Sequence, residues 1–132
     1  MRRNSPSFGR LLRRAEFTAA AKGARLHREA FGLQARRRPD APDDAPRYGI
    51  TVTKKTAPHA VDRNRMRRRL REALRLGAAL SGSPGHDYVI VGREPLLRLP
   101  FDALRDALAA AVADVTKRAP RRPQSAGRPK AE

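Results

Sequence analysis

The sequence predicts an α+β fold, a two-layer α/β sandwich with one mixed sheet and the element order αβββαβα. Apolar residues alternate in some segments, as in half-buried strands, and recur every three or four positions in others, as in amphipathic helices. Stretches rich in proline, glycine and aspartate separate these segments. The length of 132 residues favours one domain, which we place at residues 10–116, between a flexible basic arm (1–9) and a disordered basic tail (117–132).

The first part of the domain combines one short helix with two strands. Apolar residues mixed with charged ones from Leu12 to Ala20 indicate the helix, and Gly23 is well placed to end it. Residues 24–36 are then expected to be extended, because Phe31 and the residues two and four positions after it are apolar. A separate short strand around Leu26 precedes this alternating strand.

The second part of the domain contains two more strands and two more helices. A loop rich in proline and aspartate spans residues 36–46, and an alternating strand around Ile50 follows it. Residues 60–76 are predicted to be helical. The apolar run from Tyr88 to Val91 predicts a strand that is buried on both faces, and a final amphipathic helix follows Pro100.

The charge of the chain indicates a polyanionic partner. Thirty lysine and arginine residues against thirteen acidic ones give a formal net charge of +17, which favours phosphate binding because each neutralised phosphate releases counterions. A membrane surface is the other polyanion, but the chain has no tryptophan and no apolar run of transmembrane length. Without cysteines, it can form neither disulfides nor thiolate metal sites. We therefore expect a cytoplasmic protein that does not bind membranes.

The most informative segment is the predicted helix from Asp62 to Arg75, which holds seven arginines in fourteen residues. At about 100° per residue its apolar positions fall on one narrow face. These positions are Met66, Leu70, Ala73, Leu74 and Gly77. The remaining faces are rich in arginine, and only Glu72 offers an acidic partner. Uncompensated arginines repel one another, while guanidinium groups match phosphate oxygens and stack on bases. We therefore favour nucleic-acid binding over a merely solvated basic face.

The setting of this helix favours RNA over DNA. A DNA recognition helix usually lies in a helix-turn-helix arrangement, with a few side chains that reach the bases. Here the predicted helix lies between strands, and its arginines point in several directions. This arrangement suits an irregular folded RNA better than a regular groove.

A longer motif surrounds the arginine-rich helix. It consists of Gly49 to Lys55 (GITVTKK) and the run from Ala60 to Ala73, with Arg63, Asn64 and Arg65 at its centre. This motif closely resembles the signature of the bacterial ribonuclease P protein subunit, whose core is Arg-Asn-Arg. Further matching positions are Phe17, Phe31, Leu33 and the run Asp87 to Val91. The resemblance covers roughly residues 10 to 115.

The resemblance implies both a fold and a function. The fold would be shared with a ribosomal small-subunit protein and would have a left-handed crossover at the arginine-rich helix. The chain would be a subunit of an endoribonuclease, in which a catalytic RNA removes the 5′ leader from precursor tRNA with Mg²⁺ bound mainly by the RNA. The expected partners are this catalytic RNA and precursor tRNA, and we expect no obligate protein partner. The polypeptide itself is expected to contribute neither catalytic residues nor metal ligands.

The resemblance also implies two surfaces that contact RNA. The residues that would face the catalytic RNA are Lys54, Lys55, Arg63, Asn64, Arg65, Arg67, Arg68 and Arg71. The leader would lie in a cleft between the first helix and the sheet, near Phe17, Leu33 and Gln34. Ala21 stands where the family often has an aromatic residue, and Gln34 where one sometimes occurs, so leader binding is expected to depend more on charge here. Phe31 is assigned to the core, and Phe17 fits the core and the cleft equally well.

Other interpretations of the sequence are weaker. The three histidines, His27, His59 and His86, are too widely spaced to indicate a metal site, and we expect them at the surface or at helix caps. The acidic residues of the 36–46 loop indicate a solvated loop rather than a cation site. The alternative function is a non-catalytic RNA-binding protein of similar fold, such as a ribosomal protein or an RNA chaperone.

Overall fold

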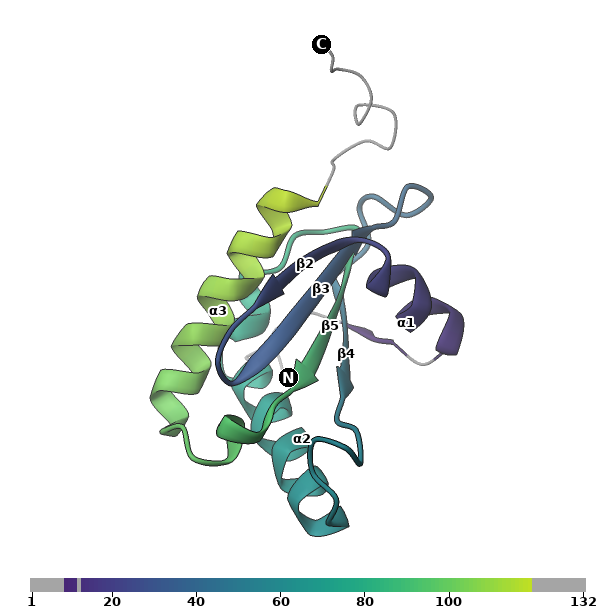
Figure 1. Ribbon diagram of the computed structural model, residues 1–132. Coiled ribbons are helices and arrows are strands. Elements are labelled where there is room, and N and C mark those ends of the chain that lie inside the picture. Colours follow the sequence, from purple (N-terminus) through teal and green to yellow (C-terminus); the bar gives the residue numbers. More distant parts are fainter. Residues whose placement is uncertain (1–8, 12, 120–132) are drawn as a thin grey trace, which may run out of the picture.

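The computed structural model describes residues 9–11 and 13–119, which form one five-stranded sheet with helices on both faces (Figure 1). The strands are β1 (Gly9–Arg10), β2 (Ala24–His27), β3 (Phe31–Arg37), β4 (Arg47–Thr51) and β5 (His86–Gly92). The helices are α1 (Arg14–Ala21), α2 (Ala60–Arg75) and α3 (Phe101–Arg118), with short 3₁₀ turns at Ala78–Ser81 and Glu94–Leu97. The predicted α+β class and the order αβββαβα are confirmed, and β1 is an additional short strand.

The strands lie in the order β1-β4-β5-β3-β2. β4 is parallel to β1 and β5, whereas β3 is antiparallel to β5 and β2, so the sheet is mixed, as predicted. Because adjacent parallel strands need a crossover connection, the chain returns from β4 to β5 through α2. The arginine-rich helix is thus the crossover element, while its left-handed sense stays a prediction.

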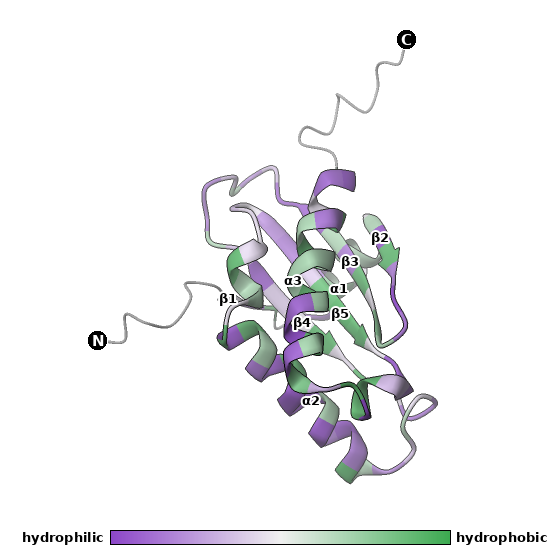
Figure 2. Cartoon of the chain, turned by 90° about the vertical axis from the view of Figure 1, so that its left-hand side faces the viewer, coloured by the Kyte–Doolittle hydropathy of each residue, from purple (hydrophilic) through white to green (hydrophobic). Residues whose placement is uncertain are grey.

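The larger core lies between the sheet and the two helices α2 and α3. Its fully buried side chains include Phe31, Leu33, Met66, Leu70, Tyr88, Ile90, Leu104, Leu108 and Val112. Tyr48 and Tyr88 stack with their ring centroids 5.1 Å apart. Figure 2 looks at this side of the molecule and shows α2 as mainly hydrophilic, because its apolar stripe is turned into the core. The core assignment of Phe31 and the apolar face of α2 are confirmed.

α1 covers part of the opposite face of the sheet (Figure 1). The smaller apolar cluster on this face consists of Leu11, Ala20 and Val89, with Phe17 and Val91 packed against it. Since side chains alternate along a strand, Gln34 faces α1 while its neighbour Leu33 faces α2 and α3. The sandwich therefore has a partial third layer, which the periodicity of the sequence did not indicate.

A buried carboxylate ties α1 to the sheet. The Asp87 side chain is 0% exposed and lies 2.9 Å from Nε of Arg38. Arg47 donates two hydrogen bonds of 2.8 Å to the same carboxylate and a third, of 2.9 Å, to Glu16 of α1. The hydrogen bonds to Asp87 raise the pKa of Arg47 above its ordinary value. This network holds α1 over one end of the sheet.

Some predicted boundaries are wrong by a few residues. Gly9 belongs to β1 rather than to the arm, and Lys117 and Arg118 end α3 instead of beginning the tail. The rest of the predicted arm and tail lies outside the described residues. Gly23 follows α1 but has no left-handed backbone conformation; a Cβ atom there would lie 2.1 Å from the carbonyl oxygen of Ala35, so only glycine fits.

Candidate nucleic-acid interface

Three arginines form one flank of α2, which we call the arginine flank: Arg67, Arg68 and Arg71. Arg68 and Arg71 are exposed, and Arg67 is half-buried and donates a hydrogen bond of 3.3 Å to Asn64 Oδ1. Among the described residues, no carboxylate forms an ion pair with any of the three. Their positive charges are therefore available to an external anion.

Two other arginines of α2 are used within the protein. Nη1 of Arg63 donates hydrogen bonds to the carbonyl oxygens of Ala57 (2.9 Å) and Pro58 (2.8 Å), and so holds the loop before the helix. Arg69 donates to the carbonyl oxygens of Leu96 (2.8 Å) and Leu99, which fixes α2 to the segment before α3. The helix thus combines arginines that have no carboxylate partner among the described residues with arginines that make structural contacts.

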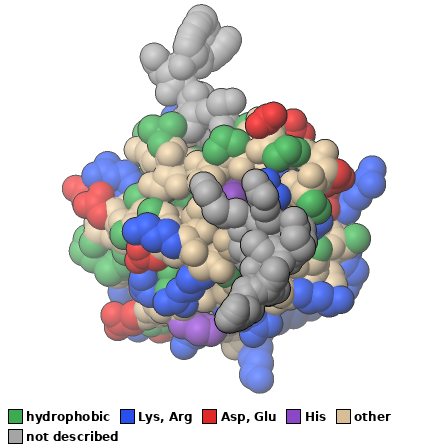
Figure 3. Space-filling model, turned by 90° about the horizontal axis from the view of Figure 1, so that it is seen from above, with side chains coloured by type: hydrophobic (Ala, Val, Ile, Leu, Met, Phe, Trp, Pro, Cys, Tyr) green, Lys and Arg blue, Asp and Glu red, His purple; other side chains and the backbone are tan. Residues whose placement is uncertain are grey.

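The other predicted residues extend the positive surface beyond the arginine flank. Lys54 and Lys55 lie in the turn after β4, and Asn64 and Arg65 lie in the first half of α2. All four are exposed. By contrast, Figure 3 shows acidic side chains among the basic ones at the end of the molecule that is seen from above.

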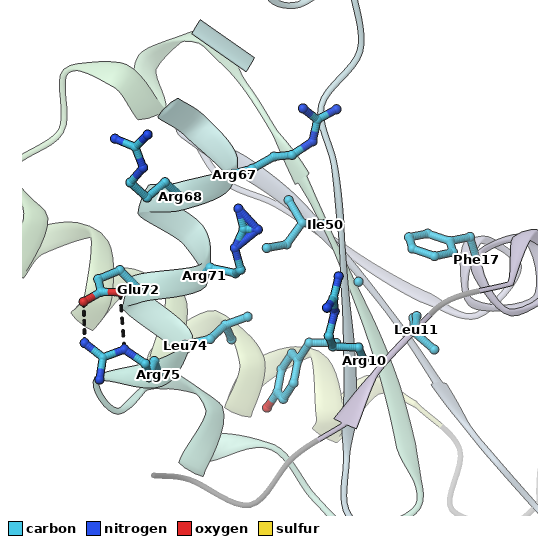
Figure 4. A pocket seen from close by; sticks show the side chains of 12 residues that line it. Arg10, Leu11, Phe17, Ile50, Arg67, Arg68, Arg71, Glu72, Leu74 and Arg75 are labelled. Carbon is cyan, nitrogen blue, oxygen red and sulfur yellow. Dashed lines mark hydrogen bonds and ion pairs between the residues drawn. The ribbon is translucent and has the colours of Figure 1, made fainter. Parts of the chain in front are cut away.

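A hollow of about 500 Å³, here called the basin, separates α2 from β1 and α1 (Figure 4). Arg67, Arg68, Arg71, Glu72, Leu74 and Arg75 of α2 line it on one side, Arg10, Leu11 and Phe17 on the other, and Tyr48, Gly49 and Ile50 of β4 between them. Of the arginine flank, Arg71 faces Arg10 across the basin (Figure 4). The sequence interpretation missed Arg10, since an isolated arginine before a helix carries no periodic signal.

The predicted cleft is present between α1 and the sheet. It is a shallow depression of about 590 Å³ lined by Arg14, Phe17, Thr18, Ala21, Gln34, Thr51, Val89 and Val91. Phe17 and Gln34 are therefore brought together, as predicted. The half-buried Phe17 ring also packs on β4: a Cβ atom on Gly49 would lie 2.6 Å from it. Phe17 thus belongs both to the small core and to the cleft wall.

Leu33 does not line this cleft. Its side chain is 1% exposed and belongs to the core beneath α2 and α3, on the opposite face of the sheet. The prediction that placed it beside Phe17 and Gln34 is wrong, because residues adjacent in a strand point to opposite faces.

The basin and the cleft form one track. Phe17 lines both, and Gln34 and Val91 line both the cleft and a smaller hollow beyond it. The arginine and histidine side chains of the cleft and the smaller hollow are Arg14, Arg25, His27 and Arg93, and neither hollow is lined by an acidic residue. Since none of these is acidic, the described part of the track suits an extended polyanion.

Two further features bear on the kind of site. Among residues 9–11 and 13–119, no group of three or more histidine, cysteine, aspartate or glutamate residues could hold a metal ion. The same residues include no helix long and apolar enough to cross a membrane. Of the histidines, His86 is 7% exposed, and its Nδ1 lies 3.0 Å from the carbonyl oxygen of Pro84.

A mixed α+β domain with an arginine-rich crossover helix beside a basic, partly apolar track defines a class of RNA-binding protein. The sequence profile of the family described as Ribonuclease P matches residues 6–116, and the chain belongs to this family. It is thus a protein subunit of the ribonuclease P ribonucleoprotein, which takes part in tRNA processing and contains an RNA subunit. The alternative of a ribosomal protein or RNA chaperone is disfavoured.

Similar proteins agree with this assignment. The ribonuclease P protein component of Brucella suis is 43% identical over 105 residues, which cover 75% of this chain and 74% of that protein. The corresponding component of Caulobacter vibrioides is 49% identical over 86 residues, or 65% of this chain and 56% of the relative. Among solved structures, the RNase P protein from Thermotoga maritima matches with a TM-score of 0.66 and 28% identity, over 80% of this chain and 96% of that one.

Proposed function

We propose that the chain assists a catalytic RNA subunit in removing the 5′ leader from precursor tRNA by holding both RNAs at once. The observation that carries this proposal is the junction at Phe17, where the basin beside the arginine flank joins the cleft. One continuous surface then serves two ligands, the structured RNA at α2 and the single-stranded leader on the sheet.

The catalytic RNA is assigned to the exposed side of α2. Arg67, Arg68 and Arg71 supply guanidinium groups that no described carboxylate pairs with, and Lys54, Lys55, Asn64 and Arg65 extend the contact surface. Arg63 acts in part through the loop that it holds. Because α2 is fixed by its buried stripe and by Arg69, these groups are presented in a fixed arrangement, which reduces the entropy lost on binding.

The leader is assigned to the cleft. Phe17 offers one aromatic surface, and base stacking on such a ring contributes about 1–3 kcal/mol per base. Ala21 and Gln34 also line the cleft, and neither can stack in this way. The basic side chains along the track, Arg14, Arg25, His27 and Arg93, would therefore supply much of the affinity.

The chemical step is assigned to the RNA subunit, with Mg²⁺ held mainly by that RNA. The polypeptide would contribute positive charge and positioning, which lowers the concentration of Mg²⁺ that the particle needs. We assign the reaction to the cytoplasm.

The test is reconstitution of the purified full chain with its cognate catalytic RNA at low Mg²⁺. We expect the protein to stimulate 5′-leader removal, and the triple variant Arg67→Ala, Arg68→Ala, Arg71→Ala to lose most of that stimulation. As a matched control, Arg98→Ala and Arg105→Ala remove arginines that pair with surface carboxylates elsewhere. Absence of stimulation by the unchanged chain would disprove the proposal.

A further inference from the structure

α1 has little apolar anchoring on the sheet. Only Ala20 of its eight residues is buried, and Phe17 is half-buried. A helix of two turns is not stable on its own, so neighbouring groups must fix its position. This position determines the width of the cleft, because Phe17 and Ala21 of α1 line it on one side and Gln34 of the sheet lines it on the other.

A carboxylate fixes the first turn of α1. Glu16 accepts a hydrogen bond of 2.9 Å from Nη1 of Arg47, and its other oxygen accepts one of 3.1 Å from the backbone N–H of Arg13. Arg47 in turn donates two hydrogen bonds of 2.8 Å to Asp87, a fully buried residue of β5. The side chains of Glu16 and Arg47 are only 21% and 26% exposed. The start of α1 is therefore tied to the core of the sheet, directly beside Phe17.

An arginine of β2 fixes the last turn of α1. Nε and Nη2 of Arg25 donate hydrogen bonds of 3.3 and 3.1 Å to the carbonyl oxygen of Ala21. The helix dipole also favours a cation at this end, and the last turn has no basic residue of its own. Arg118 of α3 holds the backbone of Arg25 through a hydrogen bond of 2.8 Å to its carbonyl oxygen. Since β5 and β3 lie between β4 and β2, the anchors Arg47 and Arg25 lie on either side of these two strands.

The charge of Glu16 is unfavourable for a protein that binds a polyanion. A carboxylate repels phosphate groups, so Glu16 cannot favour RNA binding through its charge. Arg25 has the opposite charge, but its guanidinium group is bonded to a carbonyl oxygen of α1. What the two residues share is their contact with α1 and not their charge.

We propose that Glu16 and Arg25 are positioning residues for the 5′ leader, which fix the two ends of α1 and thereby hold Phe17 at the cleft. Neither residue has to contact RNA for this role, so the contribution of Arg25 to leader affinity is mainly indirect. The inference rests on the proposed function for the identity of the ligand, whereas the position of Phe17 can be measured in the free protein.

The first experiment follows the Phe17 ring by NMR in the full chain without RNA. A Cβ atom on Gly49 would lie 2.6 Å from Cε1 and Cζ of this ring, so an Hα proton of Gly49 points at the ring and should have a chemical shift displaced by the ring current. We expect Glu16→Ala and Arg25→Met to move this shift toward that of an unstructured glycine. An unchanged shift in either variant would overturn the proposal for that residue.

The second experiment measures Kd of the reconstituted particle for precursor and mature tRNA. Glu16→Ala and Arg25→Met change the net charge in opposite directions, yet both should weaken precursor binding by about fivefold and leave mature tRNA unchanged, because part of the stacking on Phe17 is lost. Tighter precursor binding by Glu16→Ala, or no change in either variant, would contradict the proposal. Unchanged affinity for the catalytic RNA is the control for folding. Arg25 is exposed, so Arg25→Met tests the proposal even if Glu16→Ala does not fold.

Conservative substitutions separate position from charge. Glu16→Gln keeps an oxygen that can accept from Arg47, and Arg25→Gln places an amide N–H where Nε of the arginine donates to α1. Both variants lack the charge, but both should bind precursor tRNA within about twofold of the unchanged chain. They should also keep the chemical shift of the Gly49 Hα proton.

Arg93→Gln is the matched comparison for Arg25→Gln, because Arg93 is exposed and lines the same hollow as Arg25. Its charge is expected to act directly on the leader, so Arg93→Gln should weaken precursor binding and lower its salt dependence by about one counterion. If Arg25→Gln has the same effect, Arg25 binds phosphate and the inference fails. Failure of the unchanged chain to stimulate leader removal would instead disprove the proposed function and leave the Gly49 result standing.

Discussion

Adjacent arginines in α2 differ in what they contact. The side chain of Arg68 is exposed beside the basin, whereas Arg69 donates hydrogen bonds to the carbonyl oxygens of Leu96 and Leu99. The sequence could not distinguish the two residues, because helical periodicity gives the direction of a side chain but not the carbonyl groups that a distant segment places there. The prediction of an arginine-rich helix with one apolar face was therefore correct, while only the structure shows which of its arginines make internal contacts.

This difference predicts opposite effects of two neighbouring substitutions. Arg69→Ala should lower the free energy of unfolding by about 2 kcal/mol, since it leaves two carbonyl groups without their charged donor. Arg68→Ala should change it by less than about 0.5 kcal/mol and should instead weaken RNA binding. Urea unfolding of both variants measures the first quantity. Equal stabilities of the two variants would show that Arg69 has no structural role.

Tyr48 makes the stability of the protein dependent on alkaline pH. Its hydroxyl donates a hydrogen bond of 2.9 Å to the carbonyl oxygen of Ala79, and burial raises its pKa well above the ordinary value of 10.0. The unfolded chain therefore loses this proton above pH 10 while the folded chain keeps it. Stability from this group is present below pH 10 and should fall above it by up to about 1.4 kcal/mol per pH unit. Urea unfolding of Tyr48→Phe, measured from about pH 9 to about pH 11, should show a shallower fall of the free energy of unfolding with pH than the unchanged chain shows. Equal slopes in the two proteins would contradict the assignment to Tyr48.

At the scale of elements, the alternation of side chains along a strand determines which residues line the cleft. Phe31 and Leu33 lie two positions apart in β3, so they share a face, and both are buried beneath α2 and α3. Assigning Phe31 to the core and Leu33 to the cleft was therefore inconsistent with the strand itself. The sequence correctly predicted the elements and their apolar faces, but it could not show which face α1 covers, because that depends on the long-range ties of α1 to the sheet.

Asp87 is linked to α1 through Arg47, which also bonds Glu16, and this link gives a prediction for α1. Asp87→Asn leaves the guanidinium groups of Arg38 and Arg47 without their buried anion, and should lower the free energy of unfolding by about 3–5 kcal/mol. Asp44→Asn is the control, because Asp44 contacts Arg38 from a side chain that is 69% exposed. Its effect should stay below about 0.5 kcal/mol. Urea unfolding measures both, and a mild effect of Asp87→Asn would show that the network does not hold α1.

For the whole molecule, composition predicted a polyanionic partner, and the fold supports the proposal that one small domain holds two RNAs. The net charge of +17 indicated a polyanion without saying where it binds. The structure divides the basic groups between the exposed side of α2 and the track over the sheet, which meet at Phe17. Arg10 lines the basin from β1, a strand that the sequence pattern did not indicate.

The central claim is that these two surfaces bind different RNAs. Its most direct test measures Kd for the catalytic RNA, and Kd of the reconstituted particle for precursor and mature tRNA, with Phe17→Ala and Arg68→Ala. Phe17→Ala should weaken precursor binding by about tenfold and leave mature tRNA and catalytic RNA unchanged. Arg68→Ala should weaken catalytic RNA binding and reduce its salt dependence by about one counterion. Equal weakening of precursor and mature tRNA by Phe17→Ala would place this residue in the core alone and contradict the claim.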